Sequence, residues 1–82
     1  MARFFFDWRD DCSLERDEDG LDLPDLAAAK GEAYRSLLER AREVPPANQH
    51  SLSIDVRDDA SHMLLSIVLH IEVRPSGAEA AR

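Results

Sequence analysis

Three histidines are the first side chains in this chain that could bind a metal: His50, His62 and His70. A structural zinc site needs four converging ligands, and a catalytic one needs three. His62 and His70 lie on one predicted strand, which separates them by roughly 26 Å at about 3.3 Å per residue. They therefore cannot share a metal within one chain, and His50 precedes a different strand. The pattern favours surface or interface histidines and predicts no cofactor.

Cys12 is the single cysteine of the chain, and its surroundings are those of an unreactive thiol. A nucleophilic cysteine needs positive charge nearby to form the thiolate. Cys12 instead follows Asp10 and Asp11. One cysteine cannot form an internal disulfide, and the apolar run Phe4–Phe6 is far too short for a signal peptide or for a membrane span of about 20 residues. We expect a cytoplasmic protein without a membrane segment.

Carboxylates are the third group of side chains that could do chemistry. Asp17, Asp19 and Asp22 are the candidates for holding Ca²⁺ or Mg²⁺. Their spacing does not match an EF-hand, because Gly20 comes too early in the loop. A small divalent-metal protein or enzyme using this loop is the alternative interpretation. Turn formation and solvation account for the same acids. The chain has no glycine-rich phosphate loop and no nucleophile elbow, so we expect a non-enzymatic protein.

The net charge of −7 is concentrated in one segment. Nine acidic and two basic residues lie between Asp7 and Asp25, while acids and bases are equal in number elsewhere. Nucleic-acid binders and proteins that bind anionic membranes need the opposite sign, so both partner classes are disfavoured. A basic protein partner fits this charge. The acidic edge, as we call it, consists of Asp10, Asp11, Asp17, Glu18 and Asp19.

Alternation and turn signals predict the elements that position these residues. A first strand over residues 3–10 carries Phe4, Phe6 and Trp8 on one face. A weak second strand follows over 14–17, and Leu21 and Leu23 continue it after a turn. Pro24-Asp25 opens a helix with Asp25 as N-cap, and Pro45-Pro46 ends it. Two further strands are expected over 51–57 and 62–74, followed by a flexible tail over 75–82.

This order predicts an α+β fold, ββαββ, with one four-stranded sheet and one helix packed on one face. Residues 1–74 form the single domain. The last strand is long, and the strand before it offers only about seven residues to pair with it. We therefore expect the first and last strands in the middle of the sheet and the other two at its edges.

The sheet face opposite the helix retains an apolar patch that predicts a partner-binding surface. Phe5, Leu64 and Val68 lie on it, with Ser66 and His70 nearby. An exposed apolar patch on a small domain often marks an interface. We expect a homodimer through this face or through the end of the last strand. The alternative is a small patch that is simply exposed.

The chain also resembles a family of short, uncharacterised bacterial proteins, a domain of unknown function. Arg3-Phe4-Phe5-Phe6, the turn Asp19-Gly20 and the helix start Leu23-Pro24-Asp25 carry the resemblance. It continues through Ile54–Asp58 into the apolar strand that follows. Members often have histidine at Asp7 and glycine at Ala60 or Ser61. The resemblance supports the fold and implies no activity.

Taken together, these patterns predict a non-enzymatic protein-binding or regulatory module, homodimeric, that presents its acidic edge to a basic protein. A scaffold domain whose sheet edge pairs with another chain is a third interpretation.

Overall fold

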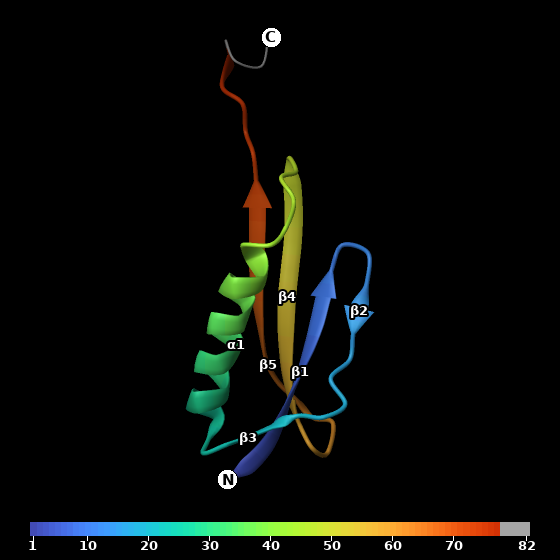
Figure 1. Cartoon of the computed structure of the whole chain (residues 1–82), viewed down its shortest axis with the longest axis vertical. Coiled ribbons are helices and arrows are strands. Elements are labelled where there is room, and N and C mark those ends of the chain that lie inside the picture. The colour runs from blue at the N-terminus through green and yellow to red at the C-terminus, as the bar shows by residue number, and fades with distance from the viewer. Residues whose placement is uncertain (78–82) are drawn as a thin grey trace.

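In the computed structural model, which describes residues 1–77, one helix packs on one face of an antiparallel sheet (Figure 1). The elements are β1 (Ala2–Asp10), β2 (Leu14–Glu15), β3 (Leu21–Leu23), α1 (Leu26–Ala41), β4 (Gln49–Asp58) and β5 (Met63–Glu72). The sheet runs β2-β1-β4-β5, and β3 also pairs with β1. The predicted α+β class is confirmed. No helix within residues 1–77 is long and apolar enough to cross a membrane.

Helix α1 begins where the sequence predicts it. Asp25 is extended, and its carboxylate accepts from the backbone N–H of Ala28 at 2.9 Å, which satisfies one unpaired amide of the first turn. The helix ends at Ala41 with Arg42 as its cap, shortly before Pro45-Pro46. Ala29 and Ala33 face the sheet, and their small side chains allow the helix backbone to approach it closely.

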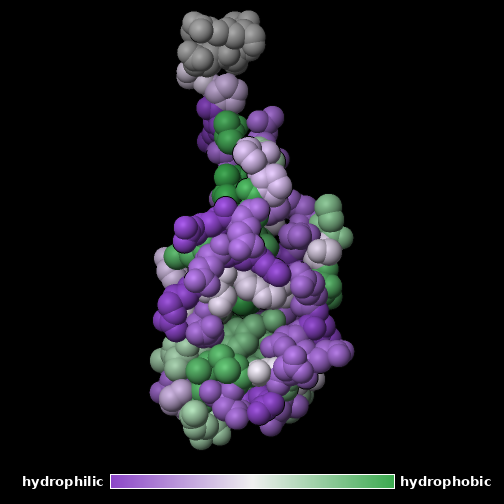
Figure 2. Space-filling model, in the orientation of Figure 1, coloured by the Kyte–Doolittle hydropathy of each residue, from purple (hydrophilic) through white to green (hydrophobic). Residues whose placement is uncertain are grey.

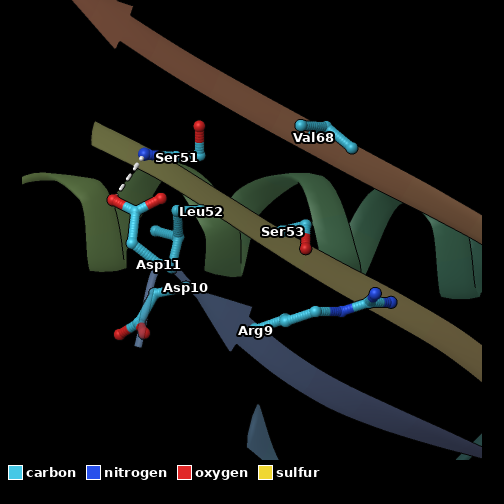
Figure 3. Close-up of a pocket in the computed structure, with 7 residues that line it drawn as sticks. All are labelled: Arg9, Asp10, Asp11, Ser51, Leu52, Ser53 and Val68. Atoms are coloured by element: carbon cyan, nitrogen blue, oxygen red, sulfur yellow. Dashed lines mark hydrogen bonds between the residues drawn. The ribbon is translucent and has the colours of Figure 1, made fainter. Parts of the chain in front are cut away.

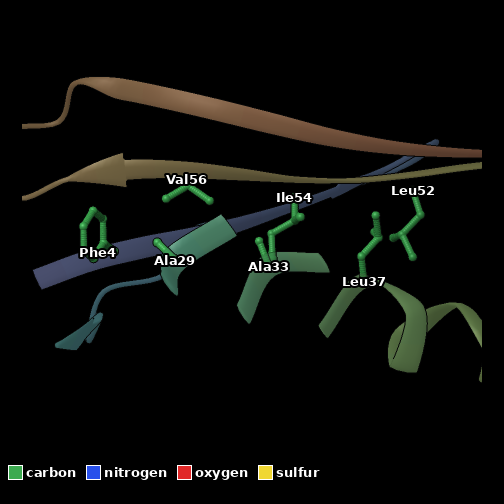
Figure 4. Close-up of a cluster of buried hydrophobic side chains, with 7 residues drawn as sticks. All are labelled: Phe4, Ala29, Ala33, Leu37, Leu52, Ile54 and Val56. Carbon is green, nitrogen blue, oxygen red and sulfur yellow. The ribbon is translucent and has the colours of Figure 1, made fainter. Parts of the chain in front are cut away.

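The hydrophobic core is one layer between α1 and the sheet. Figure 4 shows the helix side chains pointing toward the side chains of β4, with an aromatic ring of β1 at one end. Its buried members are Phe4, Ala29, Ala33, Leu37, Leu52, Ile54 and Val56. Trp8 and Phe6 pack against this cluster, as the alternation of the first strand predicts. A chain of this size buries roughly 60 % of its unfolded surface, so such a thin core is expected.

The expected second strand is divided into two. β2 pairs with the end of β1, Trp8 opposite Glu15, whereas β3 pairs with its start, Phe4 opposite Leu21. Both are antiparallel to β1 and lie along the same edge. The intervening residues 16–20 leave the edge, so the sheet has five strands and the predicted count of four was wrong.

The predicted sheet order was also wrong. β1 and β4 form the middle of the sheet, and the long last strand, β5, lies at an edge. β4 is longer than the predicted 51–57 and pairs with β5 from Gln49 opposite Glu72 to Arg57 opposite Met63. A short loop joins the two strands, so this local pairing forms at a small entropic cost. β4 and β5 extend beyond the end of α1 (Figure 1).

The predicted tail over 75–82 lies partly outside the described residues. Pro75, Ser76 and Gly77 are exposed and belong to no strand.

Candidate functional site

The sheet face opposite α1 carries buried charges rather than only solvated ones. Asp7 of β1 and Asp55 and Arg57 of β4 are all buried. Strand alternation places them opposite the core side chains, where the sequence pattern predicts outward-facing residues. Asp55 and Arg57 do lie on that face, but other parts of the chain cover them there, so they are buried rather than solvated.

The first buried pair joins β1 to β4. Arg57 Nε donates to Asp7 Oδ2 at 2.8 Å. The same guanidinium donates to the carbonyl oxygen of Asp17 at 2.6 Å and lies 4.6 Å from the centre of the Phe5 ring. Asp7 Oδ1 accepts from the backbone N–H of Asp17 at 2.9 Å. Both charges are therefore paired and hydrogen-bonded, which is the condition for burying them.

Residues 16–20 form the cover over this pair. Asp17 fixes the segment: its carboxylate accepts from the backbone N–H groups of Phe6, Asp19 and Gly20. Burial by itself would raise the pKa of Asp17, but these hydrogen bonds and the charge of Arg57 outweigh it and lower the pKa below 3.8.

Gly20 is required where this cover meets β1. Its φ is +73°, a left-handed conformation that other residues rarely adopt. A Cβ atom at Gly20 would lie 2.9 Å from Arg3 Cγ and 2.9 Å from Phe5 Cε2. Only glycine allows this close approach, which explains the Asp19-Gly20 turn.

The second buried charge, Asp55, is held by β1 and β5. Arg9 forms an ion pair with its Oδ2, and Ser66 Oγ donates to its Oδ1 at 2.6 Å. Arg9 is half exposed and covers Asp55 from the solvent side. The two pairs lie side by side, since Asp7 is directly opposite Asp55 in the β1–β4 register. This network ties β1, β4, β5 and residues 16–20 together.

The sequence reasoning missed this network. One signal was available: arginine and aspartate alternate on the same predicted face of the first strand and of the strand over 51–57. Cross-strand pairs of opposite charge stabilise a sheet. The signal could not show which charges are covered, because residues 16–20 reach them from elsewhere in the chain.

The carboxylates of the acidic edge are of two kinds: some accept hydrogen bonds within the fold, and others form none among the described residues. Asp10 accepts from the backbone N–H groups of Cys12 and Ser13, which lowers its pKa and closes the β1–β2 turn. Asp11 accepts from the backbone N–H of Ser51 at 3.3 Å. Within residues 1–77, the side chains of Glu18 and Asp19 form no hydrogen bond or ion pair, and both residues are exposed.

The predicted metal candidates do not converge. Asp17 is occupied by three backbone amides, and Asp22 pairs with Arg3 at 3.0 Å. In the described part of the chain, no three histidine, cysteine or acidic side chains are placed to hold a metal ion.

The three histidines make separate contacts, and Cys12 is exposed. His70 Nδ1 lies 2.8 Å from Ser51 Oγ, and His62 Nδ1 lies 3.2 Å from Asp58 Oδ2. His50 Nδ1 lies 3.6 Å from Asp11 Oδ2. Each histidine has a different neighbour, and none lies beside the thiol in a catalytic pair.

The four predicted partner-binding residues fall into two places. Phe5 is half buried on β1, beneath Gly20 and Arg57. Leu64, Val68 and His70 are exposed on β5 and are separated from Phe5 by β4. The exposed apolar surface therefore follows the β5 edge rather than the centre of the face.

One hollow of about 150 Å³ lies at the end of β1 beside this edge (Figure 3). It is lined by Arg9, Asp10, Asp11, Ser51, Leu52, Ser53 and Val68. Asp11 approaches the Ser51 backbone, while Arg9 extends away from Asp10 and Asp11 (Figure 3). Ser51 of this lining has its hydroxyl oxygen 2.8 Å from His70 Nδ1, and the hollow is small for an organic ligand.

A comparison with known protein families shows which family this chain belongs to. A family model described as a domain of unknown function, DUF6894, matches residues 3–70. The chain belongs to the DUF6894 family. The match covers every helix and strand of this DUF6894 domain except the first residue of β1 and the last two residues of β5. No curated protein and no solved structure matches the chain. The predicted membership of a family of unknown function is therefore confirmed.

Proposed function

We propose that this DUF6894 chain is a non-enzymatic protein-binding module, homodimeric, that presents its acidic edge to a basic protein. The observation that carries the proposal is the contrast between the two edges of its one sheet. The edge formed by β2 and β3 belongs to the acid-rich segment. The edge formed by β5 is apolar and ten residues long.

The acidic edge suits an electrostatic partner. Glu18 and Asp19 are exposed, and the internal ion pairs use other carboxylates. Lysine and arginine side chains on a partner would gain Coulomb energy here at little desolvation cost. Such contacts raise the association rate more than they raise affinity, and salt screens them.

Affinity purification from the cells that naturally make the chain tests this proposal. The tagged wild-type chain at low salt is compared with Glu18→Gln/Asp19→Asn. Glu32→Gln/Glu39→Gln on α1 is the control with the same charge change. We expect a basic protein that the wild-type chain and the control retain, and that the acidic-edge variant and high salt release. A partner set unaffected by Glu18 and Asp19 would contradict the proposal.

A further inference from the structure

A second hollow lies where the end of α1 meets the sheet. Its volume is about 270 Å³, and its walls come from the end of β1, from β2, from β4 near its start and from the residues that follow α1. Hydrophilic residues surround this end of the helix in Figure 2, and apolar surface lies beyond it where β4 and β5 continue. Pockets for drug-sized ligands occupy about 300–1,000 Å³, so this hollow suits one side chain rather than a whole organic ligand.

The one arginine in the lining of this hollow is already engaged. The guanidinium of Arg40 lies 4.2 Å from the centre of the Trp8 ring and donates to Glu15 Oε2 at 3.0 Å. Stacking on the ring and pairing with the carboxylate hold Arg40 on the β2 side. Within residues 1–77, it forms no ion pair with the other two carboxylates of the lining.

Those two carboxylates have no cationic partner in the described part of the chain. Asp10 accepts from Cys12 and Ser13 through Oδ1, which leaves its Oδ2 without a hydrogen bond there. The side chain of Glu43 forms no hydrogen bond or ion pair among the same residues. Glu43 follows the helix cap, Arg42, and the C-terminal end of a helix carries partial negative charge. A carboxylate at this end costs stability, which is the kind of local conflict expected at a functional site.

An unpaired nitrogen belongs to another residue of the lining. His50 Nε2 is buried and has no hydrogen-bond partner among residues 1–77. Nδ1 of the same ring lies 3.6 Å from Asp11 Oδ2, which favours the proton on Nδ1 and leaves a lone pair on Nε2. A buried acceptor without a partner costs free energy, and a hydrogen-bond donor would recover it.

We propose that this hollow receives an arginine side chain of the basic partner. The site deepens the proposed function and rests on it. A guanidinium carries five N–H donors in one plane, which is enough for Asp10 Oδ2, the Glu43 carboxylate and His50 Nε2. Apolar residues of the lining provide surface for its methylene stem: Val44, Pro45 and Leu52.

The charges and acceptors of the lining favour arginine over other cations. Asp10, Glu15 and Glu43 outnumber Arg40, so the lining is still negative after one more guanidinium enters. Lysine carries its charge and its three donors on a single nitrogen, so it would serve fewer of the separate acceptors. The contacts of Arg40 with Trp8 and Glu15 show that the wall of this hollow already accommodates one guanidinium.

An NMR titration with N-acetylarginine methylamide tests the site, because this probe carries the guanidinium without a partner protein. We expect saturable shifts of the amide resonances around Glu43 and His50, and a shift of the His50 Nε2 resonance as it accepts a hydrogen bond. N-acetyllysine methylamide should bind more weakly. Shifts that do not saturate, or that centre on Glu18 and Asp19, would overturn the site.

A pair of charge-matched variants shows whether Glu43 binds the probe. Glu43→Gln should weaken arginine binding about fivefold, which is the scale of a partly exposed ion pair. Glu39→Gln, one turn earlier on α1, makes the same charge change away from the lining and should bind as the wild-type chain does. Equal affinities for the two variants would overturn the role of Glu43 and with it the site.

Capture of the basic partner separates this site from the proposed function. Release of the partner by Glu43→Gln as well as by Glu18→Gln/Asp19→Asn would support the site. A partner that Glu18→Gln/Asp19→Asn releases but Glu43→Gln retains would overturn the site and leave the proposed function. A wild-type chain that captures no basic protein would overturn both.

Discussion

The guanidinium of Arg57 lies 2.8 Å from the carboxylate of Asp7 across β4 and β1, and both side chains are buried on the face opposite the helix. This ion pair is covered by residues 16–20 through contacts with Asp17. This part of the second sheet face is therefore buried, although no helix within residues 1–77 lies on it.

Breaking this pair from one side should strongly destabilise the fold. Asp7→Ala leaves the buried guanidinium without its carboxylate, so we expect a loss of about 3 kcal/mol in the free energy of unfolding. The double variant Asp7→Leu/Arg57→Met should lose less than the two single variants together, because it leaves neither charge unpaired. Urea unfolding measures the three values. Strict additivity would show that the two residues do not interact.

Gly20→Ala should loosen the cover over the same pair. The left-handed φ and the contacts with Arg3 and Phe5 both oppose a Cβ atom, so we expect a loss of about 2 kcal/mol or more. Gly31→Ala is the matched control within α1, where the added Cβ would meet only the end of Arg35 at 3.4 Å. It should stabilise the helix by about 0.5–1 kcal/mol. Equal losses for the two variants would refute the argument.

Ser61 offers a stabilising substitution. It is the non-glycine residue with positive φ, +66°, among residues 1–77. Glycine adopts this conformation without the penalty of a Cβ atom, so Ser61→Gly should raise stability by about 1 kcal/mol. Ala60→Gly in the same loop lacks this strain and should have no such gain. Thermal unfolding of both variants gives the comparison, and a lower midpoint for Ser61→Gly would contradict it.

Acid should weaken the fold partly through Asp17. Its pKa is lower in the folded chain than its ordinary value of 3.8, so the unfolded chain takes up the proton first as the pH falls. The stability that Asp17 contributes is therefore complete above the unfolded pKa and is lost as the pH falls from there toward the folded pKa. Asp17→Asn should reduce stability at pH 7 and flatten its decline between about pH 5 and 3.

Urea unfolding at several pH values measures this decline. Glu39→Gln on the helix surface is the control for removing one negative charge. An Asp17→Asn variant whose stability fell as steeply as that of the wild-type chain would show that Asp17 does not contribute to acid sensitivity.

The sequence by itself determined the local elements of this protein. Alternation identified the faces of β1 and β4, Asp25 marked the start of α1, and Pro45-Pro46 limited its end. These features depend on interactions between residues close in the chain, and the residue types carry that information directly. Membership of a family of unknown function was also readable from the residues.

Only the tertiary structure decided the order of the strands in the sheet and which charged side chains are buried. Whether β5 lies in the middle or at an edge depends on whether β1 pairs with β4 or with β5, and this long-range choice is not encoded in the pattern of any single strand. From the sequence pattern alone, three charged residues would be expected to be solvated: Asp7, Asp55 and Arg57. They are buried because residues 16–20 and Arg9 cover them. Burial is a property of the assembled chain, because the covering groups come from distant parts of the sequence.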